Sequence, residues 1–169
     1  MCRESLNQLM AVETIRARRY LFKLAALLVL LCSGCATRPL PPADFSLPGW
    51  SVQQGQVIWK PSFNRPELAG DLLLATNVNG NFFVQLMKMP FALVTARVSG
   101  DEWQIEFGAD RFSWRGRGAP PDRFAWFELP RALRDGKAGG DWKLTRVETN
   151  YFRLENPRTG EHLEGEFFP

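Results

Sequence analysis

The chain has 169 residues, enough for one compact domain and a leader. It carries 21 basic and 18 acidic residues, a net charge of +3, with three cysteines and one histidine. A zinc site at Cys32 and Cys35 would need further ligands, and with only Cys2 and His162 left no ligand set can be assembled. No βαβ pattern surrounds the cysteine pair, so we expect neither a redox pair nor a metal or cofactor.

The N-terminal segment has the pattern of a secretory signal. Three arginines between residues 16 and 19 precede an apolar run over residues 20–31, which is too short for a transmembrane helix. The Cys-Ser-Gly-Cys that ends the run resembles the lipobox of bacterial lipoproteins, whose last cysteine is diacylated and becomes the first residue after cleavage. The resemblance implies a signal peptide over residues 1–34 and lipidation at Cys35. An uncleaved anchor and a simple secretory cut are the alternatives.

Removal of the leader would make the chain formally neutral. Five of the 21 basic and two of the 18 acidic residues lie in it, which leaves 16 of each. Neutrality gives no electrostatic reason to bind nucleic acid. The leader is long before Met10, which is therefore an alternative start to Met1. Residues 35–50 are rich in proline and predict an extended tether to a single domain over residues 51–169.

From residue 51 onward, short apolar runs alternate with turn signals such as Asn79-Gly80, which predicts antiparallel strands. The run 102–107 alternates apolar and polar residues, as a half-buried strand does. The runs cover residues 56–60, 71–76, 82–88, 91–98, 102–107, 111–115, 141–148, 151–156 and 161–168. We expect a mainly β (α+β) fold of about eight strands in a meander with one helical insertion, giving a strongly curved antiparallel sheet.

The helical insertion follows the sixth run. Phe124 and Phe127 have helical spacing, and Asp122 is a candidate cap. We expect a short helix that covers the concave face of the sheet and breaks at Pro130. A second turn would then begin at Pro130 and end at Gly136.

Candidate catalytic residues are few. Glu161, Glu164 and Glu166 could suggest a glycosidase pair. However, Glu164 and Glu166 share one strand face, and a solvated face explains them better. His162 shares that phase and has no Ser or Cys nucleophile to serve. We therefore predict no catalytic residue and no enzymatic activity.

The stretch over residues 82–94 is apolar on both faces of its strands. This pattern predicts either an ordinary two-sided core or one wall of an apolar cavity, which adaptable methionine side chains would suit. The candidate cavity residues are Phe82, Val84, Leu86, Met87, Leu93, Trp103, Ile105, Phe112, Trp114, Phe124 and Phe127.

Three stretches, residues 82–98, 120–133 and 141–168, resemble the LolA/LolB-like lipoprotein-localisation family, and especially its outer-membrane receptor LolB. That family implies an incomplete half-barrel with a helical lid, whose cavity holds acyl chains of lipoproteins. Pro90 and Phe91 match a Pro-Leu pair on its protruding loop. The glycine that follows this pair in the family is Ala92 here, and the family's N-terminal helix is reduced to the proline-rich tether.

The resemblance also implies a function and a location. We expect a lipoprotein anchored in the outer membrane on its periplasmic side, because Ala36 replaces the aspartate that favours inner-membrane retention. It would bind acyl chains of lipoproteins or other lipids for lipoprotein localisation, and a periplasmic carrier protein is a possible partner. The alternative is an anchored scaffold or accessory lipoprotein of an envelope complex, with a filled core and no ligand.

The loop at Pro90 and Phe91 is implied to contact the membrane. In the family the leucine at the Phe91 position is exposed to water and is needed to pass cargo on to the membrane. The alternative is that Phe91 begins the strand 91–98 and packs inside with Leu93.

Overall fold

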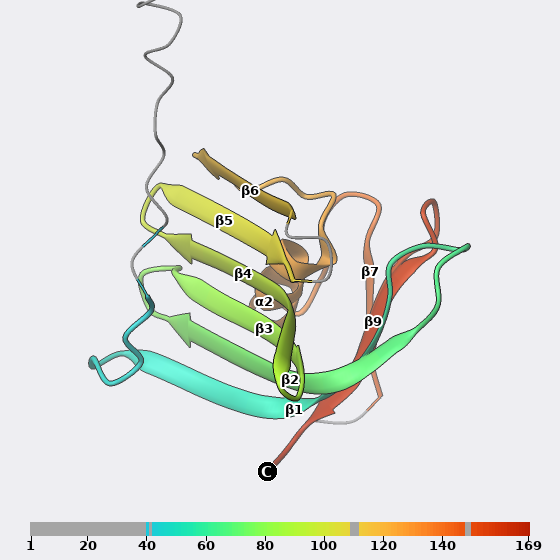
Figure 1. Ribbon diagram of the computed structural model, residues 1–169, viewed down its shortest axis with the longest axis horizontal. Coiled ribbons are helices and arrows are strands. Elements are labelled where there is room, and N and C mark those ends of the chain that lie inside the picture. The colour runs from blue at the N-terminus through green and yellow to red at the C-terminus, as the bar shows by residue number, and fades with distance from the viewer. Residues whose placement is uncertain (1–39, 41, 109–111, 148–149) are drawn as a thin grey trace, which may run out of the picture. The chain divides into compact units, whose positions relative to one another are not determined.

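The computed structural model describes Leu40 and residues 42–108, 112–147 and 150–169. Cys35, the leader and the first part of the predicted tether lie outside the described residues. The described residues form one antiparallel sheet of nine strands and one helix, so the mainly β prediction is confirmed (Figure 1). The helix is too short and too polar to cross a membrane, and the described residues contain no other.

The elements follow the predicted order. They are β1 (Trp50–Lys60), β2 (Leu68–Asn77), β3 (Phe82–Lys88), β4 (Phe91–Ser99), β5 (Glu102–Phe107), β6 (Phe112–Arg117), α2 (Ala125–Asp135), β7 (Lys143–Arg146), β8 (Tyr151–Asn156) and β9 (Glu161–Phe167). Each of the nine predicted runs forms a strand, including the four-residue β7, so the expected total of about eight strands is one too low. The predicted Asn79-Gly80 turn joins β2 to β3, with Gly80 at a positive φ of 81°.

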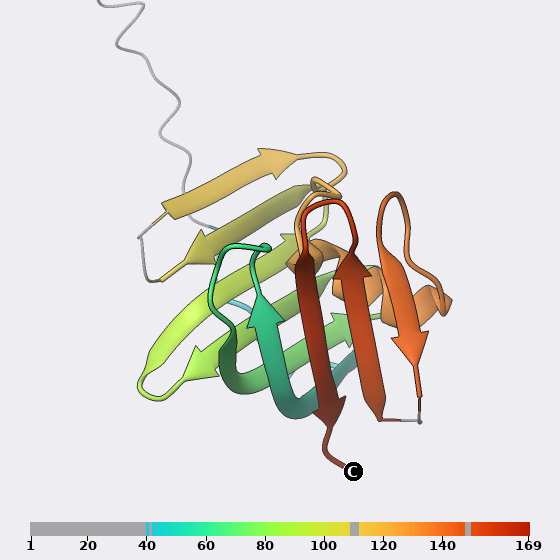
Figure 2. The ribbon, with the colours of Figure 1, turned by 90° about the vertical axis from the view of Figure 1, so that its right-hand side faces the viewer.

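The sheet is bent and open. Its strand order is β6-β5-β4-β3-β2-β1-β9-β8-β7, so β6 and β7 are its edges. We call β2–β6 the long arm (Figure 1) and β7–β9 the short arm (Figure 2). β1 joins them, since it pairs with β2 from Trp50 onward and with β9 from Gly55 onward. The helix α2 lies between the two arms, on the inner face of the sheet.

Glycine permits the close approach of strands at the bend. Gly55 of β1 pairs with Phe167, and Gly165 of β9 pairs with Val57. A Cβ atom on Gly55 would lie 2.1 Å from the carbonyl oxygen of Glu166, and one on Gly165 would lie 2.2 Å from that of Gln56. Any larger residue at these two positions would push β1 and β9 apart.

The helix α2 runs through Pro130 without the predicted break. Proline removes the hydrogen bond to the carbonyl of Trp126 and normally kinks a helix. Here burial of both sides of the first turns, at Trp126, Phe127 and Leu129, outweighs that loss. The N-cap is Phe124 rather than Asp122, while the predicted end at Gly136 is confirmed by its left-handed φ of 69°.

The segment before β1 contacts the outer face of the sheet. The ring of Phe45 packs against Phe83 of β3 at 5.2 Å and against Trp50 at 5.5 Å. The backbone N–H of Leu40 donates to Oε1 of Gln104 at 3.2 Å. This described part of the predicted tether therefore has side-chain contacts with the domain.

Candidate ligand-binding pocket

Most of the predicted cavity residues form a packed core. Val84, Leu86, Ile105 and Phe127 have no exposed surface, and Phe82 is 6% exposed. The ring of Phe127 contacts Phe82, Trp103 and Phe124 at centroid distances of 6.2, 5.6 and 6.0 Å, respectively. Trp103, Phe124 and Leu93 are partly buried and pack against the same core. These inward-facing positions are therefore packed against one another and against α2 rather than open to a cavity.

Three predicted cavity residues lie elsewhere. Met87 pairs with Asp71, next to the inward pair Leu72 and Leu86, so its side chain is on the outer face. Phe112 and Trp114 lie on the edge strand β6, are 58% and 40% exposed, and stack on each other at 6.1 Å. The ring of Trp114 still contacts Phe107 and Phe124 at the rim of the core, each at 5.7 Å.

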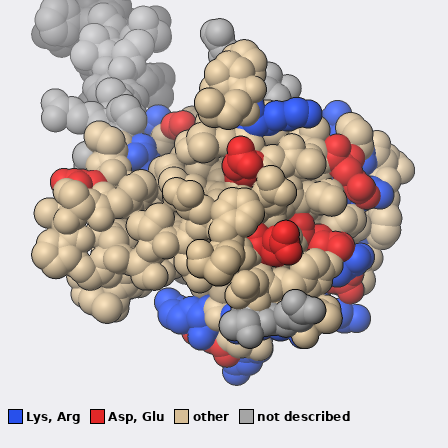
Figure 3. All heavy atoms as spheres, turned by 90° about the horizontal axis from the view of Figure 1, so that it is seen from below, with Lys and Arg blue, Asp and Glu red and all other residues tan. Residues whose placement is uncertain are grey.

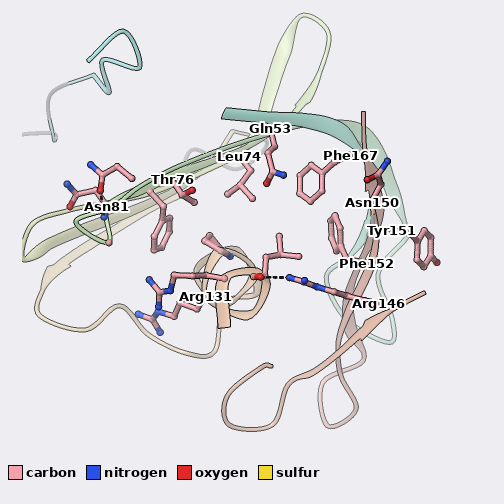
Figure 4. Close-up of a pocket in the computed structure, with 16 residues that line it drawn as sticks. Gln53, Leu74, Thr76, Asn81, Arg131, Arg146, Asn150, Tyr151, Phe152 and Phe167 are labelled. Carbon is pink, nitrogen blue, oxygen red and sulfur yellow. Dashed lines mark hydrogen bonds between the residues drawn. The ribbon is translucent and has the colours of Figure 1, made fainter. Parts of the chain in front are cut away.

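A pocket of about 350 Å³ opens instead beside the C-terminal half of α2 (Figure 4). Its floor is apolar and comes from both arms and the helix: Leu74, Phe82, Pro130, Leu133, Phe152 and Phe167. Its rim is polar: Gln53, Thr76, Asn77, Asn81, Arg131, Arg134, Arg146, Asn150 and Tyr151, with Gly80 beside them. Of the predicted cavity residues, only Phe82 lines it. The volume lies within the range of small-ligand sites.

The helix sequence explains why space remains there. Positions 127, 131 and 134 lie along one side of the helix, and positions 126, 130 and 133 along the next. The first side begins with a buried Phe127 and continues with Arg131 and Arg134, whose charged groups stay at the surface. The first turn of α2 therefore fills the space between the two arms with aromatic rings, whereas the later turns of the helix leave that space open.

A buried carboxyl group lies at the N-terminal end of α2. Glu161 of β9 accepts a hydrogen bond from Nε1 of Trp59 at 3.1 Å and another from the backbone N–H of Ala125. It thus serves the first turn of α2, which has no side-chain cap of its own. Burial raises the pKa of Glu161 from 4.5 to about 7, against the opposing effect of the two hydrogen bonds. Two neighbouring indole groups, Nε1 of Trp103 and of Trp126, have no hydrogen-bond partner among the described residues.

A second hollow lies on the outer side of the bend. Its volume of about 470 Å³ is larger, but it is an open groove over the backbone of Gly70 and Gly165. Asp71, Glu164 and Glu166 line it, and acidic side chains set in an uncharged surface are visible on the face shown in Figure 3.

Glu164 bonds to the Tyr151 hydroxyl and pairs with Arg153 at 2.9 Å, an arrangement that stabilises the sheet surface. This groove is less enclosed than the pocket beside α2. No group of three metal-ligating side chains occurs among the residues described.

The turn between β3 and β4 presents apolar side chains to solvent. Met89 is 78% and Phe91 is 69% exposed, with Lys88 and Pro90 also at the surface. Phe91 does begin β4, but it does not pack inside. The exposed alternative for Phe91 is therefore the one that the structure shows.

Sequence reasoning missed most of the pocket. Leu74, Phe152 and Phe167 come from three strands whose proximity depends on the return of β9 to β1. One signal was available, since Arg131 and Arg134 share the side of the helix that begins with Phe127.

The chain matches no protein-family model, and no curated protein matches it. These comparisons therefore place the chain in no family.

Proposed function

We propose that the protein is an outer-membrane lipoprotein of the LolB-like type that binds an acyl chain in the pocket beside α2 and serves lipoprotein localisation. The observation that carries this proposal is the apolar floor of the pocket, enclosed by two arms of the sheet and a helix. In this interpretation the open, bent sheet is an incomplete half-barrel and α2 is its lid. Each buried methylene would contribute about 0.8 kcal/mol, so uptake needs no catalytic group.

The β3–β4 turn supports contact with a membrane. Exposed Met89 and Phe91 are adaptable or bulky apolar groups at the tip of a hairpin, next to Lys88. Such a tip can enter the boundary between head groups and acyl chains while the lysine stays among the head groups. The acyl chain of another lipoprotein, delivered by a periplasmic carrier protein, could then pass between pocket and membrane.

Anchoring is proposed at Cys35. A processed lipoprotein cysteine carries more than one acyl chain, as stable membrane attachment requires. Cys35→Ser should release the protein from the membrane fraction, whereas Cys32→Ser should not. Continued fractionation of Cys35→Ser protein with membranes would refute lipidation at this residue.

Photo-crosslinking of the full-length protein in cells tests ligand binding. Cells of a Gram-negative host are fed a fatty acid with a diazirine in its chain, and irradiation is followed by peptide mass spectrometry. We expect adducts on peptides that contain Leu74 and Phe152, which line the pocket. Thr76→Trp, on the pocket wall, should reduce the adducts several-fold. The matched control Thr145→Trp, at an exposed position of β7 outside the pocket, should not.

The packed core favours a second candidate, an anchored scaffold or accessory lipoprotein of an envelope complex without a ligand. Val84, Leu86 and Phe127 leave no space between sheet and helix at that end. An absence of pocket adducts, with native folding and membrane attachment intact, would select the scaffold.

A further inference from the structure

We propose that the pocket beside α2 also takes up a lipid other than a lipoprotein, whose acyl chain carries an anionic head group, a phosphate or a carboxylate, which the rim of the pocket binds. This inference rests on the proposed function, because it concerns the same pocket. The observation behind it is the one-sided charge of the rim, in a domain whose 16 basic and 16 acidic residues balance as a whole.

Three arginines and no acidic residue line the pocket within the described part of the chain. Arg131 and Arg134 come from α2 and Arg146 comes from β7, and Figure 4 shows Arg131 and Arg146 on opposite sides of the helix. Arg134 is partly neutralised by Asp135, at 2.8 Å, which lies outside the lining. Glu148, which follows Arg146 closely in the chain, is not among the described residues. An anion above the apolar floor would complement this rim.

Arg146 and Arg131 have different tasks at the rim. Arg146 reaches across to the last turn of α2 and donates to the carbonyl oxygen of Leu133, which has no partner within the helix (Figure 4). This bond is to a neutral acceptor, and Arg146 has no ion pair with any described residue. Arg131 has no hydrogen bond or ion pair with any described residue, and it is only half-buried. Arg131 is therefore the group most available to an incoming anion.

Two asparagines add neutral donors to the rim. Oδ1 of Asn77 accepts from the backbone N–H groups of Asn79 and Asn81 at 3.0 Å, and Oδ1 of Asn81 accepts from Gly100 at 2.7 Å. Because a backbone N–H can only donate, these bonds fix the oxygen of each amide and leave its NH₂ group as a donor. Arginine and amide donors together match the oxygens of a phosphate or carboxylate and offer little to a cationic head group.

Photoreactive single-chain probes test the head group. The full-length protein is held in phosphatidylcholine nanodiscs and irradiated with dodecyl phosphate, dodecanoate or dodecanol, each with a diazirine near the chain end. We expect the two anionic probes to give about tenfold more pocket adduct than dodecanol, the effect of a charge-assisted hydrogen bond. Inorganic phosphate alone, at the concentration of the probe, should not displace dodecyl phosphate. If inorganic phosphate does displace dodecyl phosphate at that concentration, the site binds free phosphate and the lipid assignment is overturned.

Variants of Arg131 test whether this residue causes the preference for anionic probes. Arg131→Gln should reduce anionic labelling several-fold and leave dodecanol labelling unchanged, while Arg131→Lys should keep most of the preference. Arg65→Gln, in the exposed β1–β2 loop outside the pocket, is the matched control and should change neither. Equal labelling by all three probes in the parent would overturn this inference and leave the proposed acyl-chain function standing. No pocket adduct with any probe would reject both.

Discussion

The two halves of α2 face the same bent sheet, but the N-terminal half packs tightly against it and the C-terminal half borders a pocket. In the N-terminal half, Trp126 and Phe127 are fully buried, and the rings of Trp59 and Trp103 contact them at 5.3 and 5.6 Å. In the C-terminal half, Leu133 and Pro130 face a pocket of about 350 Å³. The backbone is the same regular helix in both halves. The difference is therefore one of side-chain size and charge at a few positions, and mutations can test it directly.

The largest expected effect is at the packed end. Phe127→Ala should lower the free energy of unfolding by about 3–5 kcal/mol, because it leaves a cavity among rings that cannot collapse into it. Leu133→Ala, at the pocket, should lower it by only about 1–2 kcal/mol, since that side chain already borders open space. Urea unfolding of the two variants and the parent measures both. Equal losses would mean that the two halves do not differ in packing.

The second prediction concerns the cap of the packed half. The pKa of Glu161 is raised from 4.5 to about 7, so the folded state binds its proton more tightly than the unfolded state. Its contribution to stability is therefore complete below pH 4.5 and is lost as the pH rises to 7, by up to about 3 kcal/mol. Glu161→Gln keeps an acceptor for Trp59 and should remove this pH dependence.

Unfolding free energies of the parent and of Glu161→Gln, measured from pH 4 to 8 in steps of about one pH unit, give the comparison. The difference between the two proteins isolates Glu161 from every other titrating group. Parallel curves would show that Glu161 is hydrated and that the end of the helix is not closed as described.

The sequence predicts the sheet well and the site poorly, for one physical reason. Strands and turns are local: the strand over 102–107, the Asn79-Gly80 turn and the end at Gly136 all appear as expected. The burial of that strand does not alternate as predicted, because Gln104 on the outer face is only 1% exposed and accepts a hydrogen bond from the backbone N–H of Leu40. Pro130 fails as a local signal because burial of its neighbours overrides it. The pocket is a mismatch between a helix and two arms, and its floor residues are brought together only by the pairing of β1 with β9.

The third prediction concerns a substitution that should make the C-terminal half of α2 as well packed as the N-terminal half. Leu133→Phe should extend the aromatic packing of the first turn into the pocket and raise the free energy of unfolding by about 0.5–2 kcal/mol, as cavity filling does. The same substitution should reduce acyl-chain adducts, so stability should rise while ligand binding falls. Thermal unfolding and photo-crosslinking on the same protein measure both quantities. A destabilised protein would indicate that the pocket is narrower than its volume suggests.

The smallest stability effect is expected outside the interior. Phe91→Glu should change the free energy of unfolding by no more than about 0.5 kcal/mol, because Phe91 is already 69% exposed. It should nevertheless weaken contact with liposomes, since a carboxylate does not enter the acyl-chain boundary. Melting curves and liposome flotation separate the two effects. Unchanged flotation would remove the β3–β4 turn from the proposed membrane contact.

An open sheet also has a consequence for crowding at a membrane surface. If β6 of one molecule paired with β7 of the next, the contact would not close and a fibre would grow. Both edges carry basic residues, Arg115 and Arg117 on β6 and Lys143 and Arg146 on β7. Charged side chains on edge strands discourage pairing between molecules, and like charges on the two edges oppose this contact in particular. The lipid anchor proposed above would concentrate the protein in two dimensions, where protection against edge-to-edge polymerisation matters most.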